Sequence, residues 1–91
     1  MSQVLIVTYE LANPGQNQAH LIKLIKGYTS WARLGGDAYL ILTDAAVSTV
    51  RDYLGSVMLP NDKLYVGVSP APSAWMGMPE DVAKWIHANQ R

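Results

Sequence analysis

The clearest pattern in the chain is a run of apolar residues near its start. Residues Val4–Val7 are consecutive, apolar and mostly β-branched, which predicts a strand rather than a helix. Strand side chains alternate between two faces, and here both faces are mostly apolar, so both are expected to be covered. The strand is expected to end at Glu10, before a strong turn signal at Asn13-Pro14-Gly15.

In the later segments apolar residues recur at strand or helix spacing, and glycine and proline separate one segment from the next. The predicted elements are a helix from Asn17 to about Lys26, strands at Ser30–Leu34 and Ala38–Thr43, a helix capped by Thr43 or Asp44 that stops near Gly55, a strand at Lys63–Ser69 and a helix from Pro79. The second helix is expected to bury Ala46, Val50, Tyr53 and Val57, and the last helix carries an apolar seam of Val82, Trp85 and Ile86.

This order of elements, βαββαβ with a helical tail, predicts an α+β fold. Its simplest arrangement is a ferredoxin-like sandwich, in which two helices lie on one face of a four-stranded antiparallel sheet. The first and third strands, which are apolar throughout, would then be central. The chain is expected to form one domain, with residues 1–69 as the core and residues 70–91 as a connector and C-terminal helix.

Two helices cover only one face of such a sheet, so another element has to cover the second face. The candidates are the tail from Trp75 to Ile86 and a second copy of the chain. A symmetric homodimer is the favoured interpretation. Its interface is expected to include Val4 and Ile6 from the first strand and Trp75 and Trp85 from the tail.

The composition argues against several classes of partner and site. Seven basic residues balance seven acidic ones, so the chain has no overall basic footprint for nucleic acid. It has no cysteine, which excludes disulfides and thiolate metal sites. The N-terminal apolar run is too short for a signal peptide or a membrane span, so a cytoplasmic protein without a membrane partner is expected.

Several short motifs, taken in order, resemble the small SinR-family proteins across nearly the whole chain. They are Thr8-Tyr9-Glu10-Leu11, Asn13-Pro14-Gly15-Gln16, Ile25-Lys26, Trp31 with Arg33, Thr43, Asn61-Asp62-Lys63-Leu64-Tyr65-Val66 and Trp75-Met76-Gly77. That family is similar in fold to the CRISPR-associated Cas-two proteins and the VapD-like toxins. The resemblance therefore implies a ferredoxin-like homodimer that is either a metal-dependent nuclease or a structural subunit that holds DNA.

The resemblance also implies a candidate site. In the nuclease interpretation, a carboxylate at the end of the first strand comes from each protomer, and the pair holds a magnesium ion at the dimer interface. The matching residue is Glu10, where the family has aspartate, and Arg33 stands where relatives often carry histidine. Two carboxylates and water suit magnesium. The simpler alternative for Glu10 is a solvated carboxylate at a strand end.

Other candidate residues have equally simple alternatives. Arg33 and Arg51 can contact phosphate, yet each is also an ordinary surface charge. Three hypotheses therefore remain open. The chain is a dimeric protein that associates with itself and with a nucleic acid or other macromolecule, a magnesium-dependent endonuclease, or a regulatory or toxin–antitoxin component whose tail docks a partner protein.

Overall fold

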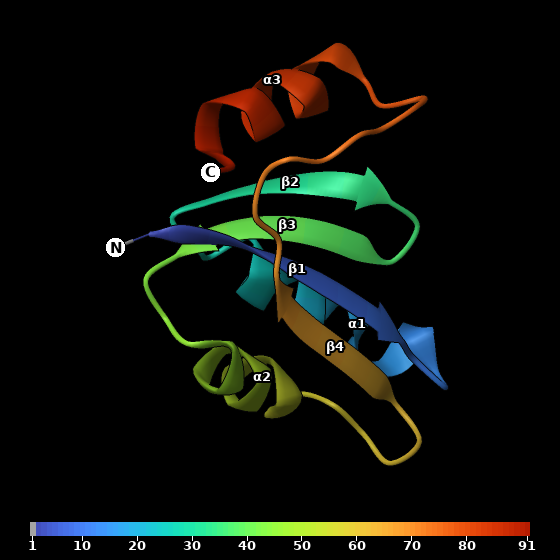
Figure 1. The fold of residues 1–91 in the computed structure, drawn as a ribbon. Helices are drawn as coiled ribbons and strands as arrows, with labels where there is room; N and C mark the ends of the chain where they lie inside the picture. The colour runs from blue at the N-terminus through green and yellow to red at the C-terminus, as the bar shows by residue number, and fades with distance from the viewer. Residues whose placement is uncertain (1) are drawn as a thin grey trace.

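The computed structural model describes residues 2–91, which form an α+β fold with a four-stranded antiparallel sheet and three helices (Figure 1). Each predicted element is present. In chain order the elements are β1 (Gln3–Glu10), α1 (Pro14–Ile25), β2 (Ser30–Gly35), β3 (Ala38–Thr43), α2 (Val47–Gly55), β4 (Lys63–Val68) and α3 (Glu80–Asn89).

The strand order in the sheet is β2-β3-β1-β4, and every neighbouring pair is antiparallel. The prediction that the first and third strands are central is confirmed, because β1 pairs with β3 on one side and with β4 on the other. This position explains why both strands are apolar on both faces. The sheet therefore has two edges, β2 and β4, and these edges are covered very differently.

The first face of the sheet packs against α1 and α2 and forms the larger core. Leu5 and Val7 of β1 lie here with Leu21 of α1 and Leu54 of α2, and all four are fully buried. Tyr9 completes the inward-facing row of β1 and is 7% exposed. The alternation of side chains along β1 thus follows the predicted pattern.

The second face is covered by the chain's own tail. Val4 of β1, Leu40 of β3 and Ala32 of β2 form a second buried cluster with Val82 and Ile86 of α3. Figure 1 shows α3 on the side of the sheet opposite α1 and α2. Of the two candidate covers, the structure contains the tail, and the apolar seam on α3 is used inside the chain.

Two helix boundaries differ from the predictions. Helix α1 begins at Pro14 rather than Asn17, because proline suits the first turn, where its missing N–H has no partner in any case. Helix α2 begins at Val47, and the predicted cap at Thr43 serves the preceding turn: its Oγ1 accepts a hydrogen bond from the N–H of Ala45 at 3.1 Å.

The buried face of α2 also differs from the prediction. Ala46 is the exposed cap residue, and Tyr53 is 51% exposed. Leu54, which the prediction omitted, is fully buried with Val50. The helix therefore turns its Val50–Leu54 side toward the sheet. The rings of Tyr53 and Tyr28 pack edge to face, with 6.2 Å between their centres. None of the helices in residues 2–91 is long and apolar enough to cross a bilayer.

Candidate interaction surface at the edge strand β4

Strand β4 leaves one side of its backbone without a strand partner in the described chain. Its pairing with β1 runs without a register shift from Leu5 opposite Val68 to Glu10 opposite Lys63. A straight, regular edge strand presents a row of unpaired N–H and C=O groups to any strand that approaches it. We call this row, with the side chains and the groove that flank it, the β4 edge.

The direction of the free backbone groups follows from the ladder. The N–H of Ser69 donates to the carbonyl of Val4 at 2.9 Å, so this position is bonded to β1. In an antiparallel pair, bonded and non-bonded positions alternate. The N–H and C=O groups of Leu64, Val66 and Val68 therefore point outward, away from β1.

Two large apolar side chains of β4 are exposed. Tyr65 is 63% exposed on the second face of the sheet, and Val68 is 54% exposed at the end of the strand. The Tyr65 ring lies along the strand above Gly67, because a Cβ atom at Gly67 would stand 2.9 Å from Tyr65 Oη and 3.0 Å from Cε2. Glycine at this position therefore leaves room for the exposed ring to lie against the strand.

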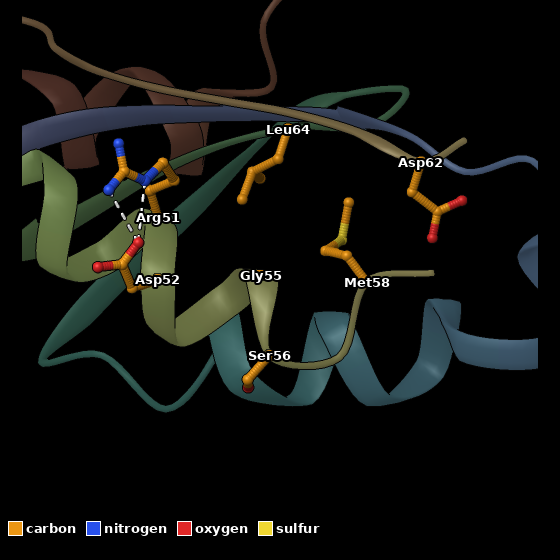
Figure 2. A pocket seen from close by; sticks show the side chains of 7 residues that line it. All are labelled: Arg51, Asp52, Gly55, Ser56, Met58, Asp62 and Leu64. Carbon is orange, nitrogen blue, oxygen red and sulfur yellow. Dashed lines mark hydrogen bonds and ion pairs between the residues drawn. The ribbon is translucent and has the colours of Figure 1, made fainter. Parts of the chain in front are cut away.

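A groove of about 450 Å³ lies beneath β4 on the first face of the sheet (Figure 2). Leu64 reaches into it from β4, and Met58 reaches into it from the loop after α2. Arg51 and Asp52 of α2 lie at its rim, where Arg51 Nη2 and Asp52 Oδ1 are 2.9 Å apart. The groove thus has an apolar floor and a charged rim.

Asp62 fixes the start of β4 and completes the rim. Its carboxylate accepts hydrogen bonds from the N–H groups of Ala12 and Leu59, both at 2.8 Å, and from Asn17 Nδ2 at 3.0 Å. These donors, with the backbone N–H of Leu59 as the largest contribution, lower the pKa of the Asp62 carboxyl. The loop before β4 is therefore tied to the start of α1 and to the loop that follows β1.

The predicted metal ligand Glu10 lies at the end of β1, on the second face and next to the β4 edge. It borders a shallow pocket of about 310 Å³ together with Thr8, Lys63 and Tyr65. Its Oε1 is 3.2 Å from Lys63 Nζ, and both side chains are more than 70% exposed. An ammonium group at this distance opposes a cation on the same carboxylate.

The donor set beside Glu10 does not fit a magnesium ion within one chain. In residues 2–91 no three His, Cys, Asp or Glu side chains come together as a metal would require. Magnesium keeps several waters but still needs carboxylate ligands, and here a single carboxylate is paired with lysine. The Glu10 site is therefore an exposed ion pair in this structure.

The structure does not bring the two candidate phosphate contacts together. Arg33 lies on β2, where Nη2 donates to the carbonyl of Gly36 at 3.0 Å within the hairpin. Arg51 lies on α2, beneath the opposite edge of the sheet, and is paired with its neighbour Asp52. A nucleic-acid surface that uses both residues would have to reach around the sheet.

The residues predicted for a dimer interface pack in the cluster between the sheet and the tail. Val4 is 3% exposed, and Ile6, Trp75 and Trp85 pack against the same cluster. Trp85 Nε1 donates to Ser30 Oγ at 2.6 Å, which fastens α3 to β2. In this fold these side chains hold the tail to the sheet.

Sequence reasoning did not find the β4 edge. The alternation of Leu64, Val66 and Val68 predicts the strand, but the sheet order is needed to show that it has an unpaired side. The signal available in the sequence was Tyr65 two residues before Gly67, an aromatic residue and a glycine on one face. Comparison of the chain with models of known families, with curated proteins and with solved structures finds no match.

Proposed function

We propose that the chain is a ferredoxin-like protein of the SinR type that acts by binding a second copy of itself rather than by catalysis. The ferredoxin-like assignment is supported by the strand order, which reads 4-1-3-2 from β4, and by α1 and α2 sharing one face. The SinR assignment is supported by the ordered motifs from Thr8-Tyr9-Glu10-Leu11 to Trp75-Met76-Gly77.

The observation that carries the proposal is the bare β4 edge. Proteins usually protect an edge strand with charges, proline, a bulge or a covering element. Strand β4 carries one charge, Lys63 at its first position, and exposes Tyr65 and Val68 along a regular backbone. A strand of this kind is suited to pairing with another strand.

The test is the molar mass in solution by light scattering at micromolar concentration. We expect twice the chain mass of 10.0 kDa. A mass of 10.0 kDa that does not change with concentration would overturn the proposal.

Magnesium-dependent cleavage by paired Glu10 residues is the alternative function, and the ion pair with Lys63 argues against it. The purified protein and Glu10→Ala are incubated with labelled RNA and DNA and magnesium. We expect no cleavage by either protein. Cleavage by the wild type that disappears in Glu10→Ala would establish the nuclease function instead.

The third hypothesis, a partner protein docked on the tail, is weakened because most apolar residues of the tail pack inside the chain, although Met76 is 94% exposed. The apolar seam of α3 is occupied, because Val82 is 8% exposed and Ile86 is 5% exposed against the sheet. A partner would have to displace the tail before it reached these residues. Self-association through an edge that is already exposed needs no such change.

A further inference from the structure

We infer that the β4 edge pairs antiparallel with β4 of a second copy, about a two-fold axis that places Val66 opposite Val66. This inference rests on the proposed self-association and names the surface that carries it. Its starting point is the sequence Lys63-Leu64-Tyr65-Val66-Gly67-Val68, which complements itself when it is read in both directions from Val66.

The backbone groups match in this register. Leu64 stands opposite Val68 of the second copy, and Val66 stands opposite its own equivalent. All three residues direct their free N–H and C=O groups outward, so every group that lacks a partner on β4 meets another such group. Pairs at odd-numbered positions would not add bonds, because those groups are already directed toward β1.

The side chains on the second face also match. Tyr65 stands opposite Gly67 of the second copy, and the symmetric pair repeats this arrangement. Each ring is 63% exposed in the single chain and lies over Gly67 of its own strand, so the two rings would run side by side across the axis, one on each strand. Aromatic residues opposite glycine are a stabilising cross-strand combination.

On the first face, the groove receives the remaining exposed side chain. Val68 of the second copy lies beside Leu64, above the apolar floor that Leu64 and Met58 form in Figure 2. Burial of Val68, which is 54% exposed in the single chain, would remove apolar surface from water on both sides of the two-fold axis. The rim holds charges of both signs, Arg51 and the carboxylates of Asp52 and Asp62, so like-charge repulsion does not dominate the approach.

This pairing has a consequence for Glu10. The two β1 strands would be three strand spacings apart, about 14 Å, and Glu10 lies level with Lys63, three residues from the axis. The two Glu10 residues are then about 25 Å apart, allowing about 10 Å along each strand. A single magnesium ion cannot bridge this separation, so the edge dimer and the shared metal site exclude each other.

The first experiment compares Val68→Asp with Met76→Asp by light scattering over a concentration series. Both variants replace an exposed apolar residue by a short carboxylate, but Met76 is 94% exposed in the connector. We expect Val68→Asp to raise the dimer Kd by about tenfold or more, because a carboxylate is driven against the apolar floor and Asp62. Met76→Asp is expected to keep the wild-type Kd, and equal Kd values for the two variants would overturn the inference.

The second experiment tests the register, and the absence of native cysteine makes it simple. In Val66→Cys the two Cα atoms would be about 5.5 Å apart, within the range of a disulfide. In Val68→Cys they would be offset by about 14 Å along the strands. We expect oxidation of the dilute protein to give a covalent dimer with Val66→Cys but not with Val68→Cys.

The outcomes separate the inference from the proposed function. A dimeric wild type whose Val68→Cys variant cross-links as fast as Val66→Cys would overturn this register while self-association stands. A monomeric wild type would overturn both. The cross-linking result does not depend on Val68→Asp, so poor folding of that variant, seen by circular dichroism, leaves the test intact.

Discussion

The two edge strands of the sheet, β2 and β4, differ in how the rest of the chain packs against them. At β2, α3 packs against the strand and Trp85 is hydrogen-bonded to Ser30, and we call this side of the sheet the closed edge. At β4, the open edge, no strand of residues 2–91 pairs with the outer side, and α3 is not packed against it. Both strands contain six residues, so length does not explain the difference.

The sequence of β2 shows how an edge is protected. Its register with β3 shifts between Arg33 and Gly35, which interrupts the regular ladder. The ammonium group of Lys26 lies 4.8 Å from the centre of the Trp31 ring, so a charge stands over the exposed aromatic residue of this strand. Bulges and charges are the usual means of preventing edge-to-edge pairing.

Strand β4 has no register shift, its one charge is Lys63 at the first position, paired with Glu10, and Tyr65 is uncovered. The comparison indicates that α3 completes one side of the molecule and leaves the other side for association. We therefore expect the closed edge to contribute to the folding of one chain and the open edge to contribute little.

The largest expected change in the free energy of unfolding comes from a substitution at the closed edge. Ile86→Ala removes a side chain that is 5% exposed between α3 and the sheet, and it should lower the free energy of unfolding by about 2–4 kcal/mol. Val68→Ala at the open edge is the matched change, because Val68 is 54% exposed. It should alter the free energy of unfolding by about 0.5 kcal/mol or less.

The measurement is urea denaturation at a protein concentration low enough to keep each variant monomeric. Similar losses for both variants would contradict the comparison, because they would show that the β4 edge is as important to the fold of one chain as the β2 side. A small loss for Ile86→Ala would show that α3 is not held on the sheet.

Removal of the hydrogen bond between Trp85 and Ser30 should give the next largest loss of unfolding free energy. Trp85→Phe keeps most of the ring but removes the N–H that lies 2.6 Å from Ser30 Oγ. Its loss should cost about 0.5–1.5 kcal/mol of unfolding free energy. Ser30→Ala and the double variant complete a thermodynamic cycle, and additive losses would show that the bond makes no net contribution.

Much of this fold could be predicted from local pattern. The continuous apolar runs of β1 and β3 predict central strands, because only a strand buried on both faces needs them. Single residues at helix boundaries were less predictable: Pro14 is read as part of a turn until the helix that follows it is seen. The helical spacing places Tyr53 on the buried face of α2, but a tyrosine can pack by its ring edge and stay half exposed, as it does against Tyr28.

The candidate surface was less predictable than the fold. Trp75 and Trp85 are large apolar residues in a tail, and sequence alone does not distinguish an intrachain cover from an interface between chains. The structure assigns them to the tail's packing on the sheet. The reverse holds for Tyr65 and Val68, which look like ordinary strand residues until the sheet order leaves β4 at the edge.

A smaller effect concerns how the start of β4 is held, and it depends on pH. The hydrogen bonds to Asp62 lower its carboxyl pKa in the folded chain, so the stability they provide is fully present above its unfolded pKa of about 3.9. This stability is lost as the pH falls through the lower, folded pKa. The free energy of unfolding should therefore decline on acidification below about pH 5.

The test is a series of denaturation curves from neutral pH into acid for the wild type and Asp62→Asn. The variant should show a shallower decline, because its side chain has no proton to take up. Asp52→Asn is the control, since that exposed carboxylate is bonded to the Arg51 side chain rather than to backbone N–H groups. An unchanged acid profile in Asp62→Asn would show that the loop anchor is not sensitive to protonation.

The smallest effect on folding is expected at Gly67, where stability and association should separate. In Gly67→Ala the new Cβ would meet the far end of the Tyr65 ring at 2.9 Å, but this ring is exposed and can turn away. The free energy of unfolding should therefore change by about 0.5 kcal/mol or less. The dimer should weaken, since the methyl group displaces the Tyr65 ring from its place over Gly67, where it is proposed to lie beside the ring of the second copy.

Gly15→Ala is the control, because a Cβ there meets no atom within 4 Å and the residue belongs to α1 rather than to the sheet. Denaturation of the monomer and light scattering of the dimer measure the two quantities separately. If Gly67→Ala lowers stability and leaves the dimer unchanged, the Tyr65 ring belongs to the fold of one chain. The exposed aromatic residue of the open edge would then have the same role as Trp31 on the closed one, and the contrast between the two edges would rest on the backbone of β4 alone.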